Sequence, residues 1–262
     1  MQSARILKQK IAQKQRVLGA LIVDHLWLGL LEICMNAQFD YVIIDGEHVH
    51  HDGDLLSDAF ALGRRADFPV LYRPGKTDAA AIRLALDLGP CGLLLPMVES
   101  ARQLDEVREG MYMPPRGRRR PGGAGNRWVQ SVNYAEWKSE VEDDLIILPQ
   151  IESARGLEEV DAIAGHEITT HMACGPYDLS ASLGVCWDPD SPKLFDALRR
   201  VREAAERRGK TLWGIAPLPL MQKLGLHFFC LTEPTLFMEA KLKELVKGVR
   251  ENPPDPVGGT QK

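Results

Sequence analysis

The chain lacks the features that would assign it to a membrane or to a nucleic acid. Among its 262 residues, no apolar run approaches the roughly 20 residues that a membrane-spanning helix needs. Charge of one sign is also scarce, because the formal net charge is only -4 at pH 7. Such a balance gives no electrostatic argument for a nucleic-acid or membrane-surface partner. We therefore expect a globular protein that binds neither.

Cysteine is sparse, and its spacing favours no covalent or metal framework. The five cysteines are an odd set and contain no Cys-x-x-Cys pair. Most lie among apolar residues, as Cys230 does within Phe228–Leu231. Buried reduced thiols fit this pattern better than disulfides or a zinc site, and they favour a cytoplasmic location.

Short β-branched or leucine-rich runs alternate with longer helical patterns along the whole chain. The predicted strands are residues 17–23, 41–45, 70–73, 92–98, 145–152, 171–175, 212–216 and 228–231. The predicted helices are residues 55–66, 79–88, 101–111, 154–164, 192–208, 218–226 and 235–250, with another amphipathic helix near residues 5–11. Eight strands, each followed by a helix, predict a single (β/α)₈ TIM barrel over residues 1–250. A doubly wound sheet would carry a Gly-rich phosphate loop after the first strand, and none follows Val23.

Two segments depart from this alternation. Residues 114–133 are rich in Pro, Gly and Arg, and are too long for an ordinary βα connection, which predicts a functional or interface-building loop. Residues 251–262 contain three prolines and a Gly-Gly pair and are expected to form a disordered tail.

Acidic and polar side chains follow the predicted strands at the ends where a barrel gathers its catalytic groups. In chain order they are Asp45, Glu47, His48, Arg73, Gln150, Glu152 and Asp178. Carboxylates at the mouth of an apolar strand are costly unless a cation pairs them. Glu152 and Asp178 close successive predicted strands, so they predict a site for Mg²⁺ or Mn²⁺. Arg73 suits a carboxylate or an enolate oxygen.

Each residue taken alone also has an ordinary structural interpretation. A single acid at a strand end is more often a helix cap or an ion-pair partner, and Asp87 is typical of a helix-end cap. Arg73 could tie barrel loops together, and the arginines of residues 116–120 are more often a solvated or intersubunit loop. The joint location at consecutive strand ends is what favours a site.

Several motifs occur together in one order. They are residues 39–48, Arg73-Pro74, residues 86–89 with 95–98, Gln150-Ile151-Glu152, and residues 175–180. In this order and spacing the chain resembles the HpcH/HpaI family of class II, metal-dependent pyruvate aldolases. That family includes 4-hydroxy-2-oxoheptanedioate aldolase and 2-dehydro-3-deoxyglucarate aldolase. The resemblance implies a pyruvate-type barrel that reversibly cleaves a 4-hydroxy-2-oxo acid to pyruvate and an aldehyde through a metal-bound pyruvate enolate.

The resemblance also implies a role for each matching residue. Glu152 and Asp178 would hold Mg²⁺, Mn²⁺ or Co²⁺, with no organic cofactor, and the 2-oxo acid would chelate that metal. Arg73 would stabilise the enolate oxygen, and His48, oriented by Asp87, would act as general acid and base. The remaining implied residues are Asp45 and Gln150, which would orient water and ligands, and Gly175, Pro176 and Tyr177 near the substrate carboxylate. No lysine lies at these strand ends, which argues against a Schiff-base aldolase.

The family further implies a homo-hexamer, a trimer of dimers, in which the last helix packs on a neighbour. This chain departs from the family at Arg119-Arg120-Pro121-Gly122, at Thr232-Glu233-Pro234, and at residues 23–27, which would contact the aldehyde. Two alternatives stay open. One is oxaloacetate decarboxylation, or another enolate-forming lyase or condensing reaction, at the same site. The other is a catalytically silent barrel that binds an oxo acid.

Overall fold

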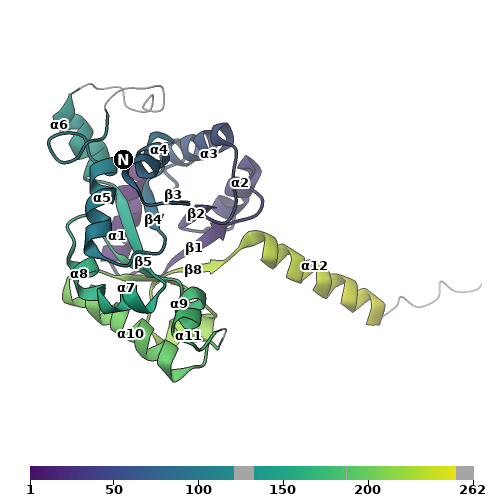
Figure 1. Ribbon diagram of the computed structural model, residues 1–262. Helices are drawn as coiled ribbons and strands as arrows, with labels where there is room; N and C mark the ends of the chain where they lie inside the picture. The colour runs from purple at the N-terminus through teal and green to yellow at the C-terminus, as the bar shows by residue number, and fades with distance from the viewer. Residues whose placement is uncertain (121–132, 187, 252–262) are drawn as a thin grey trace, which may run out of the picture.

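The strands of the protein close into one parallel barrel (Figure 1). The computed structural model describes residues 1–120, 133–186 and 188–251. Each strand pairs with the next in chain order, and β8 pairs with β1. The strands are β1 (Val17–Ile22), β2 (Tyr41–Gly46), β3 (Val70–Pro74), β4 (Gly92–Leu95), β5 (Ile146–Ile151), β6 (Met172–Cys174), β7 (Leu212–Ile215) and β8 (Phe228–Thr232). The predicted TIM barrel is therefore confirmed.

Helices surround the barrel and include four that the sequence pattern did not predict. They are α1 (Gln2–Ala12), α2 (Leu28–Asn36), α3 (Gly53–Arg65), α4 (Ala79–Asp87), α5 (Ala101–Met111), α6 (Tyr134–Trp137), the π-helix η2 (Lys138–Glu142), α7 (Ala154–Glu158), α8 (Val160–Gly165), α9 (Pro176–Ser182), α10 (Pro192–Arg207), α11 (Leu218–Lys223) and α12 (Pro234–Glu251). The predicted helix 154–164 is two helices that meet at Glu159. Helices α2, α6, η2 and α9 were not predicted. Helix α2 carries apolar residues on more than one face, and α6, η2 and α9 have only four, five and seven residues.

The barrel interior is packed beneath the strand ends that carry the polar residues. Tyr41 and Trp213 are fully buried there, and Trp213 Nε1 donates a hydrogen bond to Tyr41 Oη at 2.6 Å. The Tyr41 ring meets the Phe228 ring edge to face, with 5.2 Å between centroids. The cysteines are all unpaired, and only Cys186 is exposed. The expected buried thiols are thus confirmed at four of five positions.

The long Arg-rich connection lies at the opposite end of the barrel from the strands' carboxyl ends. It leaves α5 and returns through α6 and η2 to the start of β5, so it is an αβ connection. Residues 121–132, with Pro121 and Gly122 of the altered motif, lie outside the described residues.

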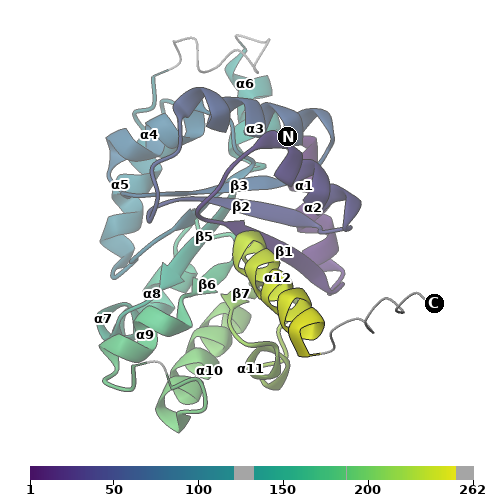
Figure 2. The ribbon, with the colours of Figure 1, turned by 90° about the vertical axis from the view of Figure 1, so that its right-hand side faces the viewer.

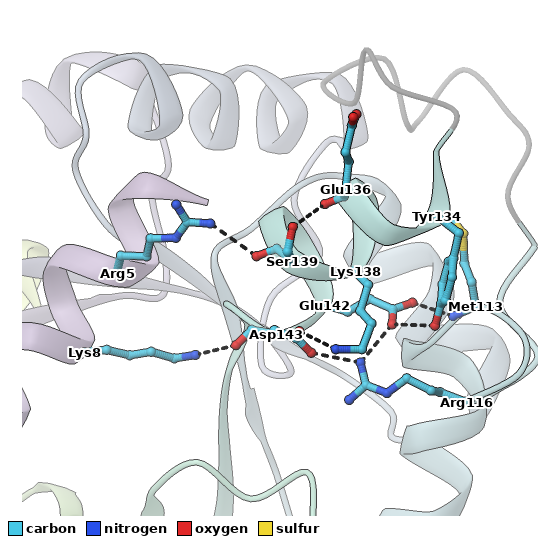
Figure 3. Close-up of polar contacts among 10 residues, drawn as sticks. All are labelled: Arg5, Lys8, Met113, Arg116, Tyr134, Glu136, Lys138, Ser139, Glu142 and Asp143. Atoms are coloured by element: carbon cyan, nitrogen blue, oxygen red, sulfur yellow. Dashed lines mark hydrogen bonds and ion pairs between the residues drawn. The ribbon is translucent and has the colours of Figure 1, made fainter.

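A buried carboxylate ties together the two sides of this connection (Figure 3). The Glu142 side chain is fully buried. It accepts hydrogen bonds from Met113 N at 2.7 Å and Arg116 Nη1 at 3.0 Å on the entering side, and from Tyr134 Oη at 3.4 Å on the returning side. Asp143 adds ion pairs to Arg116 and Lys138. Glu142 therefore anchors the base of the connection on the barrel.

Helix α12 extends away from the barrel, as the two views show (Figures 1 and 2). None of its residues is buried, although it carries a stripe of large apolar side chains. The exposed residues are Leu236, Phe237, Met238, Leu242, Leu245, Val246 and Val249. Glu233, where the chain departs from its family, caps this helix by accepting a hydrogen bond from Leu236 N at 2.7 Å.

The chain ends differ little from the prediction. Glu251 is the last residue of α12 and does not begin a tail. The rest of the expected disordered tail, residues 252–262, lies outside the described residues. In the described part of the chain, no helix combines the length and apolar character that crossing a membrane requires.

We expect Glu142→Gln to lower the free energy of unfolding by about 1–3 kcal/mol, because a neutral amide cannot replace both charged acceptor oxygens inside the protein. The matched control is Glu140→Gln, an exposed residue of the same π-helix, which should change stability by less than about 0.5 kcal/mol. Urea unfolding followed by tryptophan fluorescence measures both. Equal stabilities of the two variants would contradict the anchoring role of Glu142.

Candidate active site

A buried ion pair joins the ends of β2 and β3. Asp45 and Arg73 are register partners on these strands. Arg73 Nε donates to Asp45 Oδ1 at 2.8 Å, and Arg73 Nη2 donates to Asp45 Oδ2 at 2.6 Å, so the pair is bidentate. The Asp45 side chain is fully buried and that of Arg73 is 7% exposed. The strand register therefore builds this pair directly into the barrel.

The two charges hold each other in the ionised state. Burial on its own raises the pKa of Asp45, but the hydrogen bonds and the positive charge of Arg73 outweigh it, and the pKa lies below its ordinary value. Burial likewise lowers the pKa of Arg73, and the bonds to Asp45 more than restore it. The guanidinium of Arg73 therefore stays charged and almost fully buried at the carboxyl end of the barrel.

His48, in the loop after β2, contacts both residues of this pair. Its Nδ1 lies 2.8 Å from Asp45 Oδ2 and 2.9 Å from Arg73 Nη2. The His48 side chain is 57% exposed, so its ring is open to solvent and to a ligand. In the tautomer whose Nδ1–H donates to Asp45 Oδ2, Nε2 is the nitrogen left to accept a proton; in the other tautomer, Nδ1 accepts from Arg73 Nη2. This arrangement suits a group that exchanges a proton with a substrate.

Within one chain, Asp87 and His48 lie at opposite ends of the barrel, so a single chain does not bring this predicted pair together. Asp87 ends α4, which runs from the carboxyl end of β3 back to the start of β4, at the far end of the barrel. There it accepts a hydrogen bond from Arg119 Nη2 at 2.8 Å. Within one chain, the carboxylate that orients His48 is Asp45. Sequence spacing could not distinguish two acids that both match family motifs.

Glu152 follows β5 and is 4% exposed. Its Oε2 accepts a hydrogen bond from the backbone N–H of Met97 at 2.9 Å. Burial raises the pKa of Glu152 to about 7, against the effect of the Met97 hydrogen bond, and the negative charges of Glu47 and Asp178 raise it further. Three carboxylates therefore lie within electrostatic reach of one another, a grouping that a cation would stabilise.

The segment after β6 contains Gly175, which makes room for Glu152, and Asp178. Asp178 is exposed and lies in the first turn of α9, not at the end of β6 as predicted. A Cβ atom on Gly175 would lie 2.2 Å from Glu152 Oε1 and 2.8 Å from Gln150 Nε2. Only glycine leaves both side chains in place.

The other predicted site residues lie beside these. Gln150 is 1% exposed and its Oε1 has no hydrogen-bond partner among the described residues. Pro176 is buried at the start of α9, and Tyr177 follows it with 44% of its surface exposed. Glu47, which had no predicted role, forms an ion pair with Arg73 Nη1 at 3.1 Å. Its place within the Asp-Gly-Glu-His motif was the available signal.

Two sets of residues could hold a metal ion. Asp45, Glu47 and His48 each offer a ligand atom, all within 4.8 Å of one another. However, both oxygens of Asp45 already bind Arg73, which makes Asp45 a poor metal ligand. The second set is Glu152, Asp178 and Glu47. None of these carboxylates has both of its oxygens bound to Arg73 as Asp45 does. Burial and the negative charges of Glu47 and Asp178 raise the pKa of Glu152, and a divalent ion at this second set would relieve that repulsion.

The sequence of this chain is similar to those of known aldolases. Residues 28–216 match the family model described as HpcH/HpaI aldolase/citrate lyase. Over 253 residues the chain is 33% identical to a hydroxypyruvate/pyruvate aldolase of Pseudomonas aeruginosa, covering 93% of this chain and 94% of that protein. It is 36% identical over 197 residues to a 2-keto-3-deoxy-L-rhamnonate aldolase of Klebsiella pneumoniae, covering 70% and 72% of the two chains.

The fold agrees with this assignment. An HpcH/HpaI aldolase of Desulfitobacterium hafniense superposes with a TM-score of 0.87 at 27% identity, covering 96% of this chain and 99% of that one. The family that the sequence motifs predicted is confirmed.

The raised pKa of Glu152 predicts a pH dependence of stability. Its ordinary value is 4.5 and its value in the folded protein is about 7. The folded state therefore keeps a proton that the unfolded chain releases, and this stabilising contribution is complete below pH 4.5 and is lost as the pH rises through about 7. In metal-free protein, wild type should lose more stability than Glu152→Gln between pH 4.5 and pH 8.

Denaturant unfolding at a series of pH values measures this difference. Glu158→Gln is the control, because Glu158 is exposed on the neighbouring helix α7 and should follow wild type. Parallel pH profiles for wild type and Glu152→Gln would show that Glu152 is not held protonated by burial.

Proposed function

Because the chain belongs to the HpcH/HpaI aldolase/citrate lyase family, we propose that it reversibly cleaves a 4-hydroxy-2-oxo acid to pyruvate and an aldehyde. The observation that carries the proposal is the buried Asp45–Arg73 pair with His48 against it, facing the carboxylates that follow β5 and β6. A fixed cation and a proton-exchanging imidazole at one strand-end site are what enolate chemistry requires.

Glu152 and Asp178 are the proposed ligands of a divalent ion, Mg²⁺, Mn²⁺ or Co²⁺, with Glu47 adding negative charge. When bound, the cation polarises the keto carbonyl of the substrate and lowers the barrier to enolate formation. Gln150 orients water at the site, and the backbone of Gly175, Pro176 and Tyr177 lies where the substrate carboxylate is expected.

Arg73 and His48 divide the remaining chemistry. Arg73 places its charge beside the oxygen that becomes negative as the enolate forms, and its pairing with Asp45 removes the need to reorganise. His48 takes the proton from the 4-hydroxyl group as the carbon–carbon bond breaks, and returns it in the reverse direction. Asp45 orients both groups, because its Oδ2 contacts each of them.

We expect His48→Ala and Arg73→Ala to fail differently. His48→Ala should lose aldol cleavage by about 10²–10⁴-fold, because no base remains for the hydroxyl proton. It should keep part of any oxaloacetate decarboxylation, which forms the enolate without that proton transfer. Arg73→Ala should lose both reactions, since both pass through the enolate. Coupled pyruvate assays with the two substrates, with and without a chelator, measure the division.

The control is His50→Ala, an exposed histidine of the same loop with no proposed role. Equal loss of both reactions in His48→Ala and Arg73→Ala would overturn the division of labour. Decarboxylation without any aldol cleavage in wild type would support the alternative function of an oxaloacetate decarboxylase.

We also propose that the protein assembles through α12. In a barrel each helix normally covers the strand pair beside it, but the helix after β8 extends away. The outer face of β1 and β8 is left as a groove beside α11. Its apolar lining is Leu18, Leu218, Leu226, Phe229 and Leu231, and its polar rim includes Lys14, Arg16, Gln222 and His227. The apolar stripe of α12 matches this groove, and a second copy can supply it. A homo-hexamer is the assembly that the family resemblance implies.

Assembly would also give Asp87 a role. It lies at the far end of the barrel from His48, as does the Arg-rich connection that begins at Arg116. Both can meet an active site only if it belongs to another subunit. We therefore propose that Asp87 and this connection act at a neighbour's site, where the arginines would help to gather acidic substrates.

Charges placed in the stripe of α12 should break the assembly. We expect the double variant Leu242→Lys with Leu245→Lys to sediment as a smaller species and to lose activity, because ammonium groups cannot be buried without cost in a groove that already holds Lys14 and Arg16. Lys247→Glu, on another face of the same helix, should sediment as wild type. Analytical ultracentrifugation decides, and a fully active monomer would exclude an obligatory assembly.

A further inference from the structure

The two oxygens of the Glu152 carboxylate have different surroundings. Oε2 accepts the backbone N–H of Met97 at 2.9 Å. Oε1 faces the space beside Gly175, where a Cβ would approach it to 2.2 Å. Among residues 1–120, 133–186 and 188–251, Glu152 Oε1 receives no hydrogen bond and no ion pair. Oε2 is thus bound to the protein backbone, and Oε1 is available to a ligand.

The Met97 backbone has an unusual conformation at this point. Its φ is +49°, in the left-handed region that residues other than glycine rarely adopt. The Met97 side chain is 44% exposed, so burial of the side chain does not account for the conformation. The neighbouring Val98 N–H bonds to Gln150 O at 3.1 Å, which brings the loop after β4 against the end of β5. The turn at Met97 directs its N–H to Glu152, a kind of strain that concentrates at functional sites.

We propose that the Met97 N–H fixes Glu152 as a one-oxygen metal ligand and thereby makes the site select Mg²⁺ or Mn²⁺ over Ca²⁺. Calcium takes six to eight oxygens and often uses both oxygens of one carboxylate, whereas magnesium takes six and keeps several waters. The N–H on Oε2 occupies one lone pair of that oxygen and fixes the orientation of the carboxylate, so Oε1 is the oxygen that faces a cation and two-oxygen binding is disfavoured. This inference rests on the proposed metal role of Glu152.

Gln150 supports the same conclusion independently. Its side chain is almost fully buried, and its Oε1 has no hydrogen-bond partner among the described residues. Its Nε2 and Glu152 Oε1 both border the space at Gly175, so Nε2 can donate a hydrogen bond to a water in the shell of a cation on Oε1. A small ion that retains its waters supplies such an acceptor.

The test measures ion binding to the full-length protein without substrate. Mn²⁺ binding is followed by electron paramagnetic resonance, and Mg²⁺ and Ca²⁺ by competition. The N–H is removed by placing the α-hydroxy acid analogue of methionine at position 97, which converts the amide into an ester. Mg²⁺ affinity should fall about 10–100-fold, with a smaller change for Ca²⁺. Met97→Gly keeps the N–H and tolerates the positive φ, so its Mg²⁺-to-Ca²⁺ preference should match wild type.

An ester protein with wild-type circular dichroism and an unchanged Mg²⁺-to-Ca²⁺ preference would overturn the inference. So would a Met97→Gly protein whose preference shifts as far as that of the ester. If wild type and Glu152→Gln bind Mn²⁺ equally, the proposed metal role of Glu152 fails as well, which distinguishes the two proposals.

A second measurement needs only wild type and Glu152→Gln, should the ester protein not fold. Infrared difference spectra of ¹³C-glutamate-labelled protein, with and without Mg²⁺, report how a carboxylate binds. The Glu152 bands should show the wide separation of the two carboxylate stretches that one-oxygen coordination produces. A narrow, two-oxygen separation with Mg²⁺ would contradict the proposal.

Discussion

The bidentate pair between Asp45 and Arg73 determines the geometry of the whole site. Strand register places the two residues side by side, and burial makes each depend on the other for its charge. Removing one partner of such a buried pair typically costs about 3–5 kcal/mol, because the remaining charge is left uncompensated. His48 and Glu47 both contact this pair, so the imidazole and one of the three neighbouring carboxylates take their positions from it. The barrel therefore supplies a preorganised cation and leaves the facing carboxylates of Glu152 and Asp178 in need of another.

The two ends of the barrel carry different parts of the proposed enzyme. The strand carboxyl ends hold the proton-exchanging and cation-binding groups. The opposite end holds Asp87, Arg119 and the connection anchored by Glu142. Groups so far apart in one chain can cooperate only between copies. The exposed stripe of α12, next to a barrel face that lacks its covering helix, gives a physical reason for such copies to associate. Assembly and catalysis would then depend on each other.

The sequence predicted the barrel well because each strand is a short apolar run, and several of these runs end in polar residues. Strands β1, β2, β3, β4, β7 and β8 begin at the predicted residue. Local pattern could not find the partner of His48, because two acids matched family motifs and only the direction of α4 separates them. It could not find Met97 either, since a left-handed methionine has no sequence signal. The short helix α9, which carries Asp178, lacked the length that helical periodicity needs.

We propose that the carboxylates after β5 and β6 hold a divalent ion that allows this barrel to form the pyruvate enolate. The most direct measurement is the exchange of the pyruvate methyl protons for deuterium, followed by proton nuclear magnetic resonance, because exchange reports the enolate without any aldehyde. The account predicts that exchange stops in chelator-treated enzyme, returns with Mg²⁺ or Mn²⁺, and does not return in Glu152→Gln. Undiminished exchange in enzyme shown to be metal-free would contradict it.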